Sequence, residues 1–110
     1  MATISNLYVD QGSTFSCIVT LTNQDGSLID LTGYTVKSQF RKSYQSSQGY
    51  TFTSTVYDAV NGQVRLELDP ETTVDIRAGR YLYDVEITSG SQKFRVLEGI
   101  VVITPEITKI

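Results

Sequence analysis

The sequence predicts an all-β protein, an antiparallel β-sandwich of about seven strands. Its 14 Thr and 11 Val against 3 Ala favour pleated, half-buried surfaces over helices. Clusters of Gly, Asn, Asp and Pro recur at intervals of roughly 8–15 residues, a spacing typical of turns between short strands. Between these clusters apolar and polar residues alternate, as they do along strands with one face in a core. At 110 residues the chain is expected to form a single domain over residues 1–110.

Three segments in the first half of the chain show this alternation. Residues 14–21 place four apolar side chains on one face, among them Cys17, which we expect to pack as a small hydrophobe. Residues 34–41 and 50–57 alternate in the same way. The inward-facing residues of the three segments are Phe15, Cys17, Val19, Leu21, Tyr34, Val36, Phe40, Tyr50, Phe52 and Val56.

Residues 63–68 carry the clearest alternation, with Val64, Leu66 and Leu68 on one face. The Asn61-Gly62 pair before them is a hairpin turn signal of the type that needs a positive φ. Residues 70–77 favour a helix, because proline is tolerated in a first helical turn and a carboxylate follows it. We expect one or two helical turns in this segment.

The next strand, residues 79–88, has Tyr81, Tyr83, Val85 and Ile87 on its inward face. Residues 77–83 resemble the tyrosine corner of immunoglobulin-like sandwiches, in which the Tyr81 hydroxyl would return to a backbone group of the preceding corner. Many immunoglobulin domains carry Asp and Cys where this sequence has Arg77 and Tyr83. A chain with no Trp and a single Cys is not a standard antibody-type domain, so we expect an immunoglobulin-like sandwich of the same general class.

The last strand, residues 93–103, begins with alternation at Phe94 and Val96 and then becomes continuously apolar. Gly99 within it predicts a bulge or a change of neighbouring strand. If Phe94 and Val96 face inward, the apolar residues of the other parity face outward, and two further isoleucines follow the strand. Exposed apolar side chains of this kind mark partner sites. The candidate interface therefore comprises Leu97, Val101, Ile103, Ile107 and Ile110.

A second candidate contact surface is the polar loop at residues 45–49, which is flanked by Tyr44, Tyr50 and Phe52. Loops rich in Tyr, Ser and Gly make adaptable contacts with ligands. The other interpretation, which the sequence favours, is a long hairpin with one or two of its Tyr residues packed back on its own sheet.

Composition argues against several functional classes. The net charge of −3 gives no excess of cations for a phosphate backbone, so we expect no nucleic-acid partner. The chain contains no His, and no Ser, Cys, Asp and Glu pattern matches a catalytic, metal or cofactor motif, so we expect no enzyme, no metal and no cofactor. The sequence shows neither a signal peptide nor an apolar stretch that would span a membrane, and we expect synthesis in the cytoplasm.

Five phrases of the sequence stand out when they are taken in order: residues 30–35, 62–68, 70–73, 78–86 and 95–108. Together they resemble small structural proteins of tailed bacteriophages. This group includes the immunoglobulin-like N-terminal domains of baseplate upper proteins and other tail or capsid accessory proteins. The resemblance implies a non-enzymatic virion protein, made in the host cytoplasm, that assembles as a homo-oligomer or docks on other virion proteins. The alternative is a free-standing ligand-binding module, for instance for glycans, that uses the Tyr44 to Phe52 loop.

Overall fold

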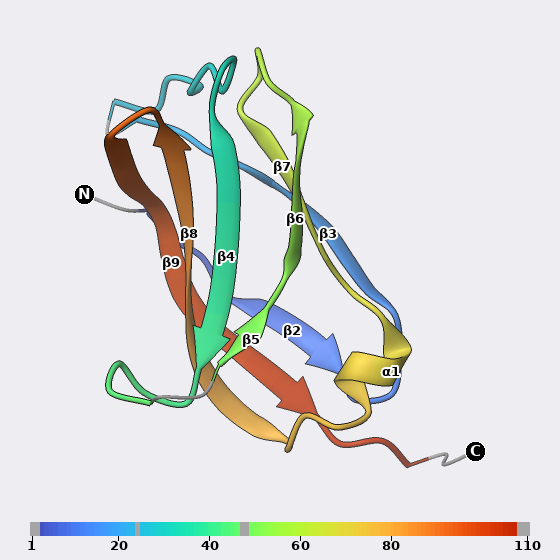
Figure 1. The fold of residues 1–110 in the computed structure, drawn as a ribbon. Coiled ribbons are helices and arrows are strands. Elements are labelled where there is room, and N and C mark those ends of the chain that lie inside the picture. Colours follow the sequence, from blue (N-terminus) through green and yellow to red (C-terminus); the bar gives the residue numbers. More distant parts are fainter. Residues whose placement is uncertain (1–2, 24, 47–48, 108–110) are drawn as a thin grey trace.

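A computed structural model describes residues 3–23, 25–46 and 49–107. The strands are β1 (Thr3–Ile4), β2 (Leu7–Asp10), β3 (Phe15–Thr20), β4 (Thr35–Arg41), β5 (Tyr50–Thr51), β6 (Thr53–Asp58), β7 (Gln63–Leu68), β8 (Gly79–Ser89) and β9 (Gln92–Thr104), and one short helix, α1, spans Pro70–Thr73. They form two layers (Figure 1). One sheet has the order β1-β9-β8-β4-β5 with β2 also paired to β9, and the other has the order β3-β7-β6.

The predicted fold class is confirmed: the protein is an all-β sandwich. Nine labelled strands correspond to about seven strand segments, because β1 and β2 follow each other along β9 and β5 continues into β6. The pairing is antiparallel with one exception that the sequence did not reveal. Strands β1 and β2 run parallel to β9, with Leu7 opposite Val101 and Asp10 opposite Thr104.

The core lies between the two sheets and contains the residues predicted from alternation. Val64, Leu66 and Val85 are fully buried, and Leu68, Tyr81, Tyr83 and Ile87 are at most 6% exposed. A chain of aromatic contacts crosses this core: the Phe40 ring lies 4.9 Å from that of Phe52 and 5.5 Å from that of Tyr81, centroid to centroid. Cys17 is half-buried and packs against the core, in line with its predicted role as a small hydrophobe.

The chain changes sheets at Phe52. Before it, β5 pairs with β4, and after it, β6 pairs with β7 in the opposite layer. Phe52 sits between the two pairings, is 2% exposed and packs on the core. Tyr50 stacks on the Phe40 ring with 5.2 Å between centroids. The prediction that Tyr50 and Phe52 form an outer contact loop is therefore wrong, because the crossing between layers turns both rings inward.

Helix α1 closes one end of the sandwich, and the predicted short helix is confirmed there. The Asp69 carboxylate caps it by accepting a hydrogen bond of 2.9 Å from the Thr72 backbone N–H. Buried Thr73 donates from its hydroxyl to the Ser13 carbonyl at 2.8 Å. The helix thus connects the segment before β8 to the start of β3.

A β-bulge corrects the assignment of faces on β9. Val85 pairs with Leu97 but Glu86 pairs with Arg95, so Val96 is an extra residue on β9. One extra residue reverses the facing of every side chain beyond it. Leu97, Val101 and Ile103 are therefore core residues, at most 3% exposed, and the prediction that they form an outward interface is wrong.

Tyr81 occupies the corner between α1 and β8. Its hydroxyl donates a hydrogen bond of 2.7 Å to the carbonyl oxygen of Arg77, the return to the backbone that a tyrosine corner makes. Its ring packs edge-on against the Phe40 ring.

Replacing Tyr81 with Phe is expected to lower the free energy of unfolding by about 1–3 kcal/mol, because the Arg77 carbonyl would lose its partner while the ring stays in place. Urea denaturation followed by circular dichroism measures the change. Tyr57→Phe, at a tyrosine that is 52% exposed, is the control and should leave the midpoint in place. An unchanged midpoint for Tyr81→Phe would mean that the residue acts as a space-filler.

Candidate functional site

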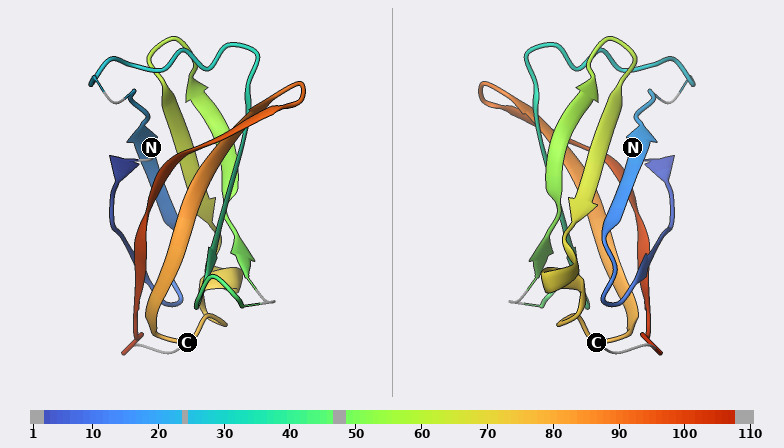
Figure 2. Two further views of the ribbon diagram at one scale, coloured as in Figure 1. Left: turned by 90° about the vertical axis from the view of Figure 1, so that its left-hand side faces the viewer. Right: turned by 90° about the vertical axis from the view of Figure 1, so that its right-hand side faces the viewer.

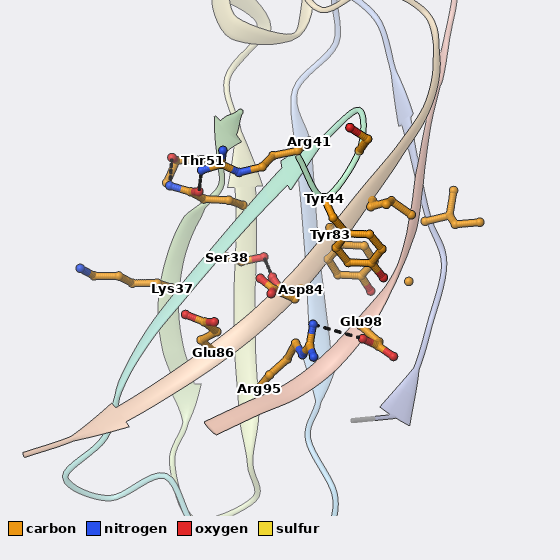
Figure 3. A pocket seen from close by; sticks show the side chains of 15 residues that line it. Lys37, Ser38, Arg41, Tyr44, Thr51, Tyr83, Asp84, Glu86, Arg95 and Glu98 are labelled. Carbon is orange, nitrogen blue, oxygen red and sulfur yellow. Dashed lines mark hydrogen bonds and ion pairs between the residues drawn. The ribbon is translucent and has the colours of Figure 1, made fainter. Parts of the chain in front are cut away.

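A groove runs over the outer face of the larger sheet, across β4, β8 and β9 (Figure 3). It has a volume of about 490 Å³. Its walls come from alternate residues of each strand, because side chains on one face of a sheet recur every second residue. In the left view of Figure 2 this sheet faces the viewer, with β3, β6 and β7 behind it.

Charged residues from neighbouring strands line one end of the groove. Glu86 on β8 pairs in register with Lys37 on β4. Its ion pair is with Lys93 on β9, with 3.4 Å between the Lys93 Nζ and the Glu86 carboxylate. Arg95 and Glu98 form a second ion pair at 3.6 Å. Both pairs are partly exposed, so each contributes only about 0–1 kcal/mol to stability.

Arg41 is fixed in place by neutral acceptors. One end of its guanidinium donates to the Ser46 carbonyl at 2.7 Å, and the other donates to the Gln39 side-chain oxygen at 3.0 Å. Gln39 in turn donates to the Thr51 hydroxyl at 3.2 Å. Arg41 therefore holds the loop after β4 against the sheet.

Asp84 lies at the middle of the groove, between Gln39 on β4 and Glu98 on β9. Among the described residues, its carboxylate makes neither a hydrogen bond nor an ion pair; the bond from the Ser38 hydroxyl goes to its backbone oxygen, at 2.6 Å. Burial raises the pKa of the Asp84 carboxyl, and nearby Glu86 raises it further, whereas Arg95 opposes both. Asp84 is thus a half-buried carboxylate without a counter-ion in direct contact.

The other end of the groove is apolar. Leu82 on β8 and Ile100 on β9 face each other across the strand pair and line the groove. The apolar surface continues to Val102, whose neighbour on β2 is Tyr8, 67% exposed. We call Tyr8, Leu82, Ile100 and Val102 the apolar strip. Tyr44, 76% exposed, reaches over the sheet from the loop after β4 and lines the same groove (Figure 3).

The remaining predicted contact residues lie apart from this groove. Ile107 is 95% exposed beyond the end of β9. Ile110 lies outside the described residues. Of the predicted contact residues, Tyr44 is the one that lines the groove. The sequence analysis did not single out Asp84 or the apolar strip as site residues. A signal for the strip was the uninterrupted apolar run at residues 100–103, in which every second residue had to face outward.

The described part of the chain offers no group of three or more His, Cys, Asp or Glu side chains that could hold a metal ion. In the same residues, no helix has the length and apolar character needed to cross a membrane. The arrangement of the groove suits non-covalent recognition: apolar side chains and an aromatic ring at one end, and carboxylates with matched cations at the other.

Comparisons with known proteins show the fold. Neither a family model nor a curated protein matches the sequence. Among solved structures, the N-terminal domain of ORF48 from phage TP901-1 has a TM-score of 0.58 at 10% identity, over 90% of this chain and 84% of that chain. InlP of Listeria monocytogenes has a TM-score of 0.50 at 13% identity, over 91% of this chain and 26% of InlP. A family 123 glycoside hydrolase from Clostridium perfringens has a TM-score of 0.42 at 10% identity, over 94% of this chain and 23% of the hydrolase.

The chain spans about a quarter of the length of InlP. The match to the ORF48 domain, in contrast, covers most of both chains. The chain is therefore similar, as a whole, to a domain of a phage protein.

Proposed function

We propose that this chain is a non-enzymatic structural component of a tailed-phage particle, acting through protein–protein docking. The observation that carries the proposal is the likeness to the ORF48 N-terminal domain, at a TM-score of 0.58 and over most of both chains. The sequence resemblance to phage tail and capsid accessory proteins supports the same assignment. In this proposal the chain is made in the host cytoplasm and ends in the virion.

The apolar strip is the docking surface in this proposal. Tyr8, Ile100 and Val102 lie on the outer face of β2 and β9, where Tyr8 is 67% exposed and Ile100 and Val102 are partly exposed. Exposed apolar patches with a polar rim are typical of protein interfaces. The proposed occupants are a second copy of the chain, giving a homo-oligomer, or another virion protein.

The alternative function is glycan binding through the Tyr44 to Phe52 loop, but this loop does not present a row of exposed aromatic rings. Sugar recognition needs flat rings spaced along an exposed face, but Phe52 is buried and Tyr50 stacks on Phe40. Tyr44 remains as a single exposed ring of that set. We therefore retain docking as the proposed function.

The test is whether the chain enters particles. Mass spectrometry of purified particles produced from the genome that encodes it should detect the chain, and Val102→Lys should abolish its incorporation by placing a charge in the apolar strip. Ser16→Lys is the matched control, since it adds the same charge to the outer face of the opposite sheet, at an exposed position of β3.

Both variants should keep the circular dichroism spectrum of the parent chain. Sedimentation of the purified chain then separates the two occupants: a defined oligomer that Val102→Lys dissociates indicates self-association, and a monomer indicates docking on another virion protein. Finding the chain in the particle-free fraction alone would contradict the proposed function.

A further inference from the structure

We propose that the groove over β4, β8 and β9 binds an arginine side chain presented by the docking partner. This inference rests on the proposed function and specifies the chemistry of the partner: an exposed arginine within an otherwise apolar contact surface. It is argued from the Asp84 carboxylate, which has no cation in direct contact among the described residues, and from the shape and the aromatic ring of the groove.

Among the described residues, Asp84 is the one carboxylate of the groove that no cation contacts directly. Glu86 and Glu98 are ion-paired with Lys93 and Arg95. Asp84 between them has no such partner among the described residues. Arg95 and Lys93 lower the pKa of Asp84 from a distance but pair with other carboxylates, and Arg41 donates to Ser46 and Gln39. Lys37 extends away from Asp84 (Figure 3). Contact with an incoming cation stabilises a half-buried, unpaired carboxylate more than it stabilises a fully solvated one.

The shape of the groove matches a long side chain with a charged end. Leu82 precedes Asp84 by two residues on the same face of β8, and Ile100 lies opposite Leu82 on β9. A methylene chain can therefore lie on Leu82 and Ile100 while its head group reaches Asp84. The volume of about 490 Å³ leaves room for such a side chain together with part of its backbone.

The aromatic ring favours arginine over lysine. Tyr44 lines the groove and is 76% exposed, so its ring is accessible to a ligand. A guanidinium stacks on aromatic faces and donates two parallel hydrogen bonds to one carboxylate, whereas an ammonium is a compact, strongly hydrated charge. Tyr44 and Asp84 together supply the two contacts that a guanidinium uses best.

The burial-driven rise in the pKa of Asp84 agrees with this geometry. A bound guanidinium would lower that pKa, because an opposite charge in contact favours the ionised carboxylate. Binding is therefore expected to strengthen as the pH rises through the titration of Asp84.

The inference can be tested with the isolated chain and a minimal probe. N-acetyl-arginine-N-methylamide is titrated into the ¹⁵N-labelled protein, with the capped citrulline analogue as an uncharged control of the same shape. Chemical shifts should change at the amides of Leu82, Asp84, Glu98 and Ile100, and the citrulline probe should change them at least tenfold less. Asp84→Asn should weaken binding of the arginine probe to the level of citrulline.

Glu67→Gln, which removes a carboxylate from the outer face of β7 in the opposite sheet, is the matched control and should leave the titration unchanged. Equal responses to both probes, or unaltered binding in Asp84→Asn, would overturn the inference. That result leaves particle incorporation unaffected and therefore leaves the proposed function standing. Absence of the chain from particles, in contrast, contradicts the proposed function whatever the titration gives.

Discussion

Gly99→Ala is expected to lower the free energy of unfolding by about 2–5 kcal/mol and to loosen the N-terminal strands from β9. Gly99 lies on β9 at the point where its partner changes from β1 to β2. A methyl group there would overlap the Ser5 carbonyl oxygen and come within 2.7 Å of the Ser5 carbonyl carbon. The estimate of about 2–5 kcal/mol combines overpacking with the loss of one buried hydrogen bond.

Ser5 cannot easily move aside, because three interactions fix the segment around it. Its N–H donates to the Glu98 carbonyl at 2.8 Å, and its own carbonyl accepts from the Tyr83 hydroxyl at 2.8 Å. The Asn6 side chain accepts from the Ile100 N–H at 3.2 Å. Burial raises the pKa of Tyr83 to about 12, so its phenol remains a donor throughout the neutral range. Glycine is thus required here for space.

Urea denaturation gives the total effect of Gly99→Ala, and amide hydrogen exchange locates it, with faster exchange expected across residues 7–10. Gly49→Ala is the milder comparison and should lose less stability, because its added methyl meets the Arg41 Cγ at 2.9 Å and the Phe40 carbonyl oxygen at 3.2 Å, whereas the methyl at position 99 overlaps a backbone carbonyl. A Gly99→Ala protein with the parent midpoint and unchanged exchange would show that the N-terminal strands tolerate displacement.

The sequence was sufficient to predict the fold where polar and apolar residues alternate without interruption. On β7, Arg65 and Glu67 reveal which face is wet, so the burial of Val64 and Leu66 follows directly. On β8, the same logic applies from Tyr81 to Ile87. In these strands each polar residue indicates that its two neighbours point to the buried face, so the local sequence is enough to assign the faces.

The sequence was insufficient on β9 for a physical reason. Residues 100–103 are all apolar, so no polar residue reports their facing, and the bulge at Val96 shifts the parity set by Phe94. The bulge depends on how β9 pairs with β8, which is a long-range property. Parallel pairing of β2 with β9 is equally non-local, since it joins the two ends of the chain.

The candidate groove depends on the same long-range pairings. Asp84 is distinctive because the available cations contact other groups: Lys93 contacts Glu86 and Arg95 contacts Glu98. The sequence identifies opposite charges on adjacent strands but not which of them meet. The register of three strands decides that, and with it the position of the unpaired carboxylate.

Phe40→Ala is expected to lower the free energy of unfolding by about 3–5 kcal/mol, a typical cost of removing a buried aromatic ring. Phe40 is fully buried on β4 and faces the other layer. Its ring contacts those of Tyr50 at 5.2 Å, Phe52 at 4.9 Å and Tyr81 at 5.5 Å between centroids. Removing it leaves a cavity at the point where β5, the crossing at Phe52 and the tyrosine corner meet.

The denaturation midpoint in urea measures this effect, and near-ultraviolet circular dichroism reports on the three remaining rings, whose signal should weaken as their packing loosens. Tyr44→Ala is the control: it also removes an aromatic ring near the end of β4, but one that is 76% exposed, and it should change stability by less than about 0.5 kcal/mol. A small domain has only about 5–15 kcal/mol of stability in total, so Phe40→Ala should bring this chain close to unfolding. A loss under about 1 kcal/mol would mean that the two sheets are held together elsewhere and that the aromatic contacts between layers are incidental.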